Sequence, residues 1–150
     1  MEVRREEDTP WITRLGAIAM RRVLNRVATQ REPHLVWNAF IDLVAVEAYV
    51  DLSDLQRKAH LVFWYDSEVQ NGGHGQYFEN HGTERIGEVI RALEDLQLTC
   101  LAQVLKEAIS VFADASVNAL DRFDDAYHLC KPSAIEGLEV HLAKYQDEYV

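Results

Sequence analysis

The sequence has 150 residues, 48% of them hydrophobic and 27% charged, and a formal net charge of -10 at pH 7. This length and composition are typical of one folded domain and exclude a largely disordered or fibrous protein. Residues 1–60 hold nine basic and nine acidic residues, whereas residues 61–150 hold six basic and sixteen acidic ones. Because surplus negative charge repels phosphates, nucleic acid is not expected as a direct ligand.

The start of the chain and the two cysteines bear on where the protein works. The opening MEVRREED mixes charges and lacks the apolar stretch of a signal peptide, and no segment approaches the roughly 18 apolar residues of a membrane span. Cys100 and Cys130 stand alone without a CxxC pair, which favours two reduced thiols. We therefore expect a cytoplasmic protein that makes no membrane contact.

The first elements expected in chain order are two helices. Thr9 and Pro10 combine a capping hydroxyl with a proline at the first helical position, which predicts a helix to about Gln30, after loosely ordered residues 1–9. The run from Leu35 to Tyr49 holds too many apolar residues for a single stripe, so it predicts a mostly buried helix.

The next helices have clearer start and stop signals. Ser53 and Gln56 form a capping-box pattern that opens a helix ending at the glycines 72 and 73, and Thr83 is the expected cap of an amphipathic helix. Helices are also predicted from about Cys100 to Phe112 and from Val117 to Leu129. Ser133, with Glu136 completing a second capping box, opens the last one.

No run of residues alternates with the period of two that is typical of strands. The predicted fold class is therefore all-α: a single-domain bundle over residues 1–150, with about six to seven helices and no significant sheet.

One segment, residues 68–80, is not explained by helix building, and we call it the motif corner. It holds three glycines within four residues, flanked by amides and aromatic rings. The pattern predicts that one helix ends in the left-handed region and that a short helix begins near Gln76. Two interpretations stay open: an interhelix corner in which Gln76 and Asn80 satisfy backbone groups, and a recognition pocket. The candidate residues are Glu68, Asn71, Gly72, Gly73, Gln76, Tyr77, Phe78 and Asn80.

The motif E-V-x-N-G-G-x-x-Q-Y-F-x-N in this corner resembles the bacterial DNA-mimic protein family. The resemblance covers about residues 35–149 and also rests on Phe123, Asp124, Tyr127 and Tyr145. It implies an all-helical fold and, for the family's best-known type, a carboxylate-covered surface that imitates duplex phosphates and occupies a DNA-binding regulator. The chain departs from the family pattern at His74, where an aromatic residue is usual, and at Gln97-Leu98, where a Gly-Ala pair is usual.

Acidic residues recur at helical spacing in the later part of the chain. Carboxylates four residues apart on a helix lie roughly 6 Å apart, close to the spacing of successive phosphates along one DNA strand. Arg91, between two of these acids, would neutralise part of the row. The candidate partner-binding residues are Glu84, Glu88, Asp95, Asp114, Asp121, Asp124 and Asp125.

These patterns favour an acidic binding protein over an enzyme, with a basic protein as its partner, such as a DNA-binding regulator or a nucleoid protein. An immunity-type inhibitor of a nuclease toxin and a small-ligand or enzyme module at the motif corner are the alternatives. We predict no catalytic residue, cofactor or metal site, because the spacing of His74, Glu79 and His81 matches no metal-binding motif. The aromatic residues of the second and third helices leave a homodimer open.

Overall fold

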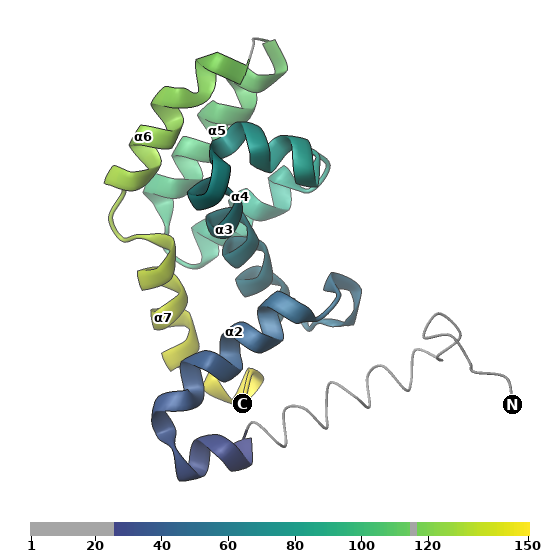
Figure 1. Cartoon of the computed structure of the whole chain (residues 1–150), viewed down its shortest axis with the longest axis vertical. Helices are drawn as coiled ribbons and strands as arrows, with labels where there is room; N and C mark the ends of the chain where they lie inside the picture. Colours follow the sequence, from purple (N-terminus) through teal and green to yellow (C-terminus); the bar gives the residue numbers. More distant parts are fainter. Residues whose placement is uncertain (1–25, 115–116) are drawn as a thin grey trace, which may run out of the picture.

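The computed structural model of the protein describes residues 26–114 and 117–150. Within these ranges it describes every side chain except those at positions 114, 117 and 118. All regular secondary structure in these residues is helical, which confirms the predicted all-α class (Figure 1). Residues 26–31 are helical and end one residue after the predicted Gln30. The predicted cap at Thr9 and Pro10 and the segment 1–9 lie outside the described residues.

The described α-helices are α2 to α7, joined by short 3-10 turns. The α-helices are α2 (Val36–Val46), α3 (Asp54–His81), α4 (Ile86–Asp95), α5 (Thr99–Asp114), α6 (Asp121–Leu129) and α7 (Ala134–Lys144). The 3-10 turns are η2 (Pro33–Leu35), η3 (Tyr49–Asp51), η4 (Val117–Leu120) and η5 (Gln146–Glu148).

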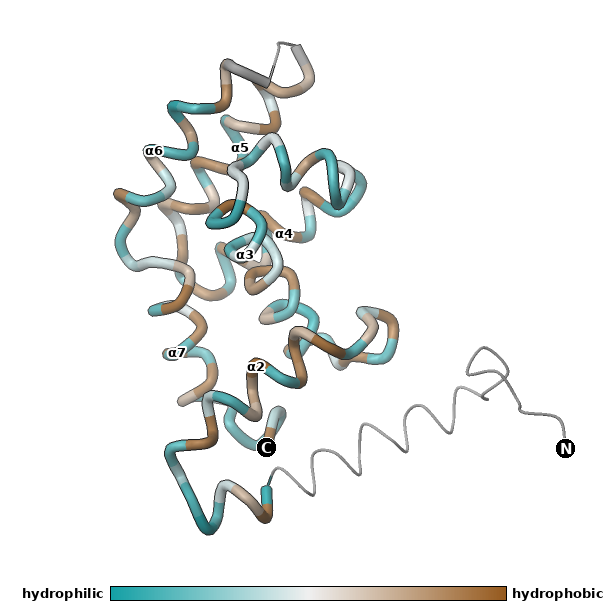
Figure 2. Tube along the Cα trace, in the orientation of Figure 1, coloured by the Kyte–Doolittle hydropathy of each residue, from teal (hydrophilic) through white to brown (hydrophobic). Residues whose placement is uncertain are grey.

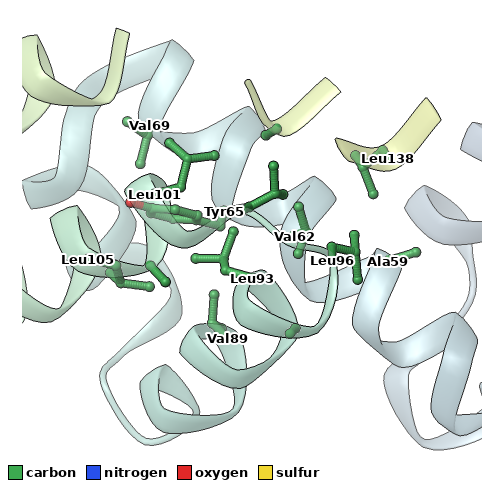
Figure 3. Close-up of a cluster of buried hydrophobic side chains, with 14 of the residues drawn as sticks. Ala59, Val62, Tyr65, Val69, Val89, Leu93, Leu96, Leu101, Leu105 and Leu138 are labelled. Carbon is green, nitrogen blue, oxygen red and sulfur yellow. The ribbon is translucent and has the colours of Figure 1, made fainter. Parts of the chain in front are cut away.

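Helix α3 is the element around which the others pack: α2, α4, α6 and α7 all contact it, and α5 packs against α4 and α6. Apolar and polar residues are mixed along each helix, as amphipathic helices require (Figure 2). The apolar sides meet in one core, where Val62 and Tyr65 of α3 lie close to Leu93 of α4 and Leu101 of α5 (Figure 3). Helix α3 therefore carries the motif corner and also packs against α4 and α6, which carry acidic candidate residues.

Local signals predicted the starts of α3 and α7 correctly but misplaced the start of α4. Ser53 and Gln56 make the reciprocal capping box: the Gln56 amide N–H donates to the Ser53 hydroxyl and the Gln56 side chain accepts from the Ser53 N–H. The Ser133 hydroxyl accepts from the Glu136 N–H as predicted, but the Glu136 carboxylate lies 3.7 Å from Lys131 Nζ. The predicted cap at Thr83 is wrong, because α4 begins at Ile86 after a turn.

The end of α4 has a left-handed residue that is not glycine. Gln97 has φ of 63°. The Leu98 N–H donates to the Leu93 carbonyl at 2.8 Å, and the Gln97 N–H donates to the Glu94 carbonyl at 3.0 Å. These two bonds are the Schellman arrangement, in which the residue after the helix cap adopts a positive φ and is usually glycine. Leu98, next in the chain, is fully buried and anchors the turn.

Replacing Gln97 by glycine is expected to raise the free energy of unfolding by about 1 kcal/mol, because a side chain in the left-handed region costs more than the backbone entropy of glycine. Chemical denaturation of the wild type and Gln97→Gly checks this. Gln103→Gly, a change to glycine at an exposed position inside α5, should lower stability instead. Equal losses in both variants would contradict the assignment of the turn.

The prediction of two reduced thiols is wrong, because Cys100 and Cys130 form a disulfide with their Cα atoms 5.6 Å apart. The first turn of α5 lies beside the end of α6, a proximity that the sequence separation of 30 between the two cysteines conceals. Disulfides persist mainly in oxidising compartments, so the cytoplasmic location stays a prediction. Within the part of the chain that the structure describes, no helix is both long and apolar enough to cross a membrane.

Candidate functional site

The motif corner is a sharp kink inside α3. Gly72 has φ of -152° and ψ of 15°, and Gly73 has φ of 78° and ψ of -179°, so the helix is interrupted at the predicted place. A Cβ on Gly72 would lie 1.9 Å from Gln76 Oε1, and one on Gly73 would lie 2.4 Å from Asp124 Oδ2. Gly73 is therefore required by its backbone conformation as well as by space, and a side chain on Gly72 would displace the side chain of Gln76.

Glu68 holds the two arms of the kinked helix together. Its carboxylate accepts from Gln76 Nε2 at 3.0 Å, from Asn80 Nδ2 at 3.1 Å and from His81 Nε2 at 3.2 Å. These donors, led by Gln76, lower the pKa of Glu68. The interpretation of Gln76 and Asn80 as partners of backbone groups is therefore wrong: both serve the carboxylate that opens the motif.

His74, the residue after the glycines, is fully buried and links α3 to α6. Asp124 Oδ1 accepts from the His74 backbone N–H at 2.9 Å and from its Nδ1 at 2.7 Å. The other ring nitrogen, Nε2, lies 2.6 Å from the Tyr65 hydroxyl, which donates to it. Burial lowers the pKa of His74 despite the neighbouring carboxylate, so the ring is held in its neutral form.

A second buried pair lies beside this one. The Tyr127 hydroxyl of α6 donates to Asp66 Oδ1 of α3, and burial followed by the charge of Asp66 raises the pKa of Tyr127. Tyr77 and Phe78 of the motif are buried, Phe78 against Phe112 with ring centroids 4.8 Å apart. The motif corner is thus filled by its own side chains and fastened to α6, while Asn71 is exposed at the outside of the kink.

Two of the predicted acidic residues on α4 are paired within the protein. The Glu88 carboxylate accepts from the Tyr49 hydroxyl at 2.6 Å and lies 3.5 Å from Arg85, and Asp95 lies 3.1 Å from Lys58. Glu84, in the turn before α4, is exposed. The row on α4 is therefore largely neutralised, and by Lys58 and Arg85 rather than by the predicted Arg91.

The acidic residues of α6 behave in two different ways. Asp121 and Asp125 are exposed and four residues apart, and within residues 26–114 and 117–150 neither has a hydrogen-bond or ion-pair partner; we call them the acidic pair. Asp124 points to His74 instead, so its prediction as a residue of the partner surface is corrected. The Asp114 side chain lies outside the described part, and that prediction stays open.

Several residues that build the site were missed by sequence reasoning. Tyr65 and Asp66 lie on a row of α3 that is otherwise apolar and inward, between Val62 and Val69. A carboxylate on such a row is a signal, because buried polar groups have partners. The partner of Asp66, Tyr127, lies 61 residues further along the chain, so the sequence of α3 could not predict it. Tyr127 is nevertheless one of the residues on which the family resemblance rests.

Acid is expected to destabilise the protein through two buried histidines and one partly buried histidine. Burial lowers the pKa of His60 and His74 and, with Lys58 and Lys144 nearby, that of His141 to about 4, against an ordinary value of 6.5. Below 6.5 the unfolded chain therefore binds more protons than the folded one, so this stability is complete above that pH and is lost as the pH falls.

Denaturant titrations at about pH 7.5 and about pH 5 measure this effect. His141→Gln keeps a donor toward the Tyr149 hydroxyl, which His141 Nε2 reaches at 2.6 Å, but it cannot bind a proton. The variant should lose less stability than the wild type on acidification. Identical losses in both proteins would show that His141 does not contribute.

Comparison with protein families finds that residues 50–149, two thirds of the chain, match a model described as DMP19-like protein. The matched part holds the whole motif corner and both residues of the acidic pair. Comparison with curated proteins and with solved structures gives no match.

Proposed function

We propose that this chain, which belongs to the DMP19-like protein family, is an acidic binding protein. In this proposal it occupies the basic DNA-binding surface of a regulator or nucleoid protein. The family is one of DNA mimics, and the net charge of -10 agrees with a basic partner. The observation that carries the proposal is the exposed acidic pair on α6, free of any partner in the described residues.

The contacts of the acidic residues support a smaller binding surface than the one predicted from the sequence. Glu88 and Asp95 of α4 already have cationic partners, so contacting them would require breaking existing pairs. The acidic pair has no such cost, and its spacing of four residues separates the carboxylates by roughly 6 Å, as in successive phosphates of one strand. We therefore place the centre of the partner surface on α6.

The motif corner has a supporting role in this proposal. Asp124 and Tyr127 of α6 are bonded to His74 and Asp66 of α3, on the inner side of the helix that presents the acidic pair. Such bonds fix the rotation of α6, and a fixed array of charges binds better than a mobile one because less entropy is lost. The motif then serves binding without contacting the partner.

The experiment that tests the proposal is retention of DNA-binding proteins from a lysate of the source cells on immobilised protein, with elution along a salt gradient. Replacing Asp121 and Asp125 together by Asn should lower the affinity roughly tenfold, so retained proteins should elute at lower salt. The matched control is Glu32→Gln with Glu139→Gln, two exposed acids elsewhere that change the net charge equally. Equal retention by both double variants would reject the α6 surface.

The immunity-type alternative uses the same chemistry and differs in its partner. A retained nuclease that loses activity on binding would identify it, whereas a retained regulator that releases its DNA supports the DNA-mimic function.

A further inference from the structure

A pocket of about 230 Å³ lies beside the motif corner, between the middle of α3, its last turn and the start of α4. Its walls include the aromatic rings of Tyr49, Trp64 and Tyr77 and the side chains of His60, His81 and Arg85. The glycines of the motif are not in its lining; the motif contributes Tyr77. The corner itself, one alternative for a ligand site, is therefore filled, and an open pocket lies next to it.

Two polar groups of the pocket residues have no hydrogen-bond partner in the part of the chain that the structure describes. Tyr77 is 4% exposed, and among the described residues nothing hydrogen-bonds to its hydroxyl. His60 Nδ1 lies 2.8 Å from the Val44 carbonyl and must donate to it, which leaves Nε2 as an acceptor. Burial lowers the pKa of His60, in keeping with this neutral form. Because a buried hydroxyl such as that of Tyr77 normally has a partner, the pocket favours a ligand that can hydrogen-bond.

Arg85 places a guanidinium at the rim of the pocket, and Glu88 pairs with one side of it. The guanidinium lies over the Tyr49 ring, 4.0 Å from the centroid, and Nη1 lies 3.5 Å from Glu88. The remaining N–H donors of this planar group suit a carboxylate. Glu68 and Glu88 are near but do not line the pocket. A cationic ligand is disfavoured because Arg85 already covers the face of Tyr49.

We propose that this pocket binds a small planar aromatic carboxylate, with its ring against Trp64 and Tyr77 and its carboxylate at Arg85. A ring N–H or O–H on the ligand has an acceptor in His60 Nε2. Drug-sized ligands fill pockets of about 300–1,000 Å³, so this smaller one takes a molecule of one or two rings. The site is separate from the acidic pair, and its test does not depend on the protein partner.

Titration of the full-length, 15N-labelled protein with indole-3-carboxylate, followed by NMR, tests the proposal. The chain has three tryptophans, and Trp64→Phe assigns the indole N–H signal of Trp64. The Trp64 signal should shift, and that of Trp37, on α2 and outside the pocket, should not. Indole-3-carboxamide, which has the same shape without the charge, should bind roughly tenfold more weakly.

Variants separate the contributions of the pocket. Arg85→Gln should reduce the affinity for the carboxylate to that for the carboxamide, whereas Arg91→Gln, inside α4 and outside the pocket, should leave it unchanged. Tyr77→Phe keeps the ring and should weaken both probes. A Trp64 signal that neither probe moves at concentrations up to about 5 mM would overturn the proposal. Equal affinity of both probes for the wild type would overturn it as well.

Discussion

Gly73→Ala is expected to lower the free energy of unfolding by about 3 kcal/mol or more. With φ of 78° and ψ of -179°, Gly73 lies in a region that is essentially restricted to glycine, and a Cβ there would lie 2.4 Å from Asp124 Oδ2. The added methyl would force apart the contact that fastens α3 to α6. Denaturant titration measures the loss.

Two other glycines are matched controls for this variant. Gly82 has φ of 69° with no atom near its Cβ position, so Gly82→Ala isolates the backbone cost. Gly87 lies inside α4 with open space around it, so Gly87→Ala should raise stability by about 0.5–1 kcal/mol. If Gly73→Ala lowered the free energy of unfolding no more than Gly82→Ala does, the contact between Gly73 and Asp124 would contribute nothing to stability.

Asp124→Ala is expected to have a comparable effect, a loss of about 3 kcal/mol, because it leaves two buried donors of His74 without an acceptor. Asp125→Ala, one residue along the same helix, removes an exposed carboxylate without a partner in the described residues and should change stability by no more than about 0.5 kcal/mol. Thermal and chemical denaturation of both variants check the contrast. Similar stabilities would mean that Asp124 belongs to the surface after all.

The two large effects should also be coupled. In the Asp124→Ala background the carboxylate that a Cβ on Gly73 would meet is absent, so Gly73→Ala should cost less than it does in the wild type. Gly82→Ala should cost the same in both backgrounds. Strict additivity for Gly73 and Asp124 would contradict their contact.

The fold class could be predicted from the sequence because the signals that define helices are local. The Ser53 capping box and the helix interruption at Gly72 and Gly73 depend on neighbours within four residues, and both were predicted at the right place. The prediction that α4 starts at Thr83 was wrong, because a turn precedes Ile86. No side chain caps the start of the helix there, so no local signal marks it.

The candidate site was predicted less well, because its chemistry depends on contacts distant in sequence. Asp124 and His74 are 50 residues apart and Asp66 and Tyr127 are 61 apart, so helical spacing could only place Asp124 in an acidic row. Asp121 and Asp125 share that spacing and are exposed, but only coordinates distinguish them from the inward Asp124. The pairing of Asp95 with Lys58 was hidden for the same reason.

The most direct measurement of the proposed function is competition with duplex DNA for the DNA-binding proteins that the immobilised chain retains. The account predicts that added duplex displaces them, that the acidic-pair variant retains them more weakly, and that the Glu32 and Glu139 variant behaves as the wild type does. Proteins that stay bound to the chain while they also hold duplex DNA would contradict the account, because phosphate imitation requires both ligands to use one surface.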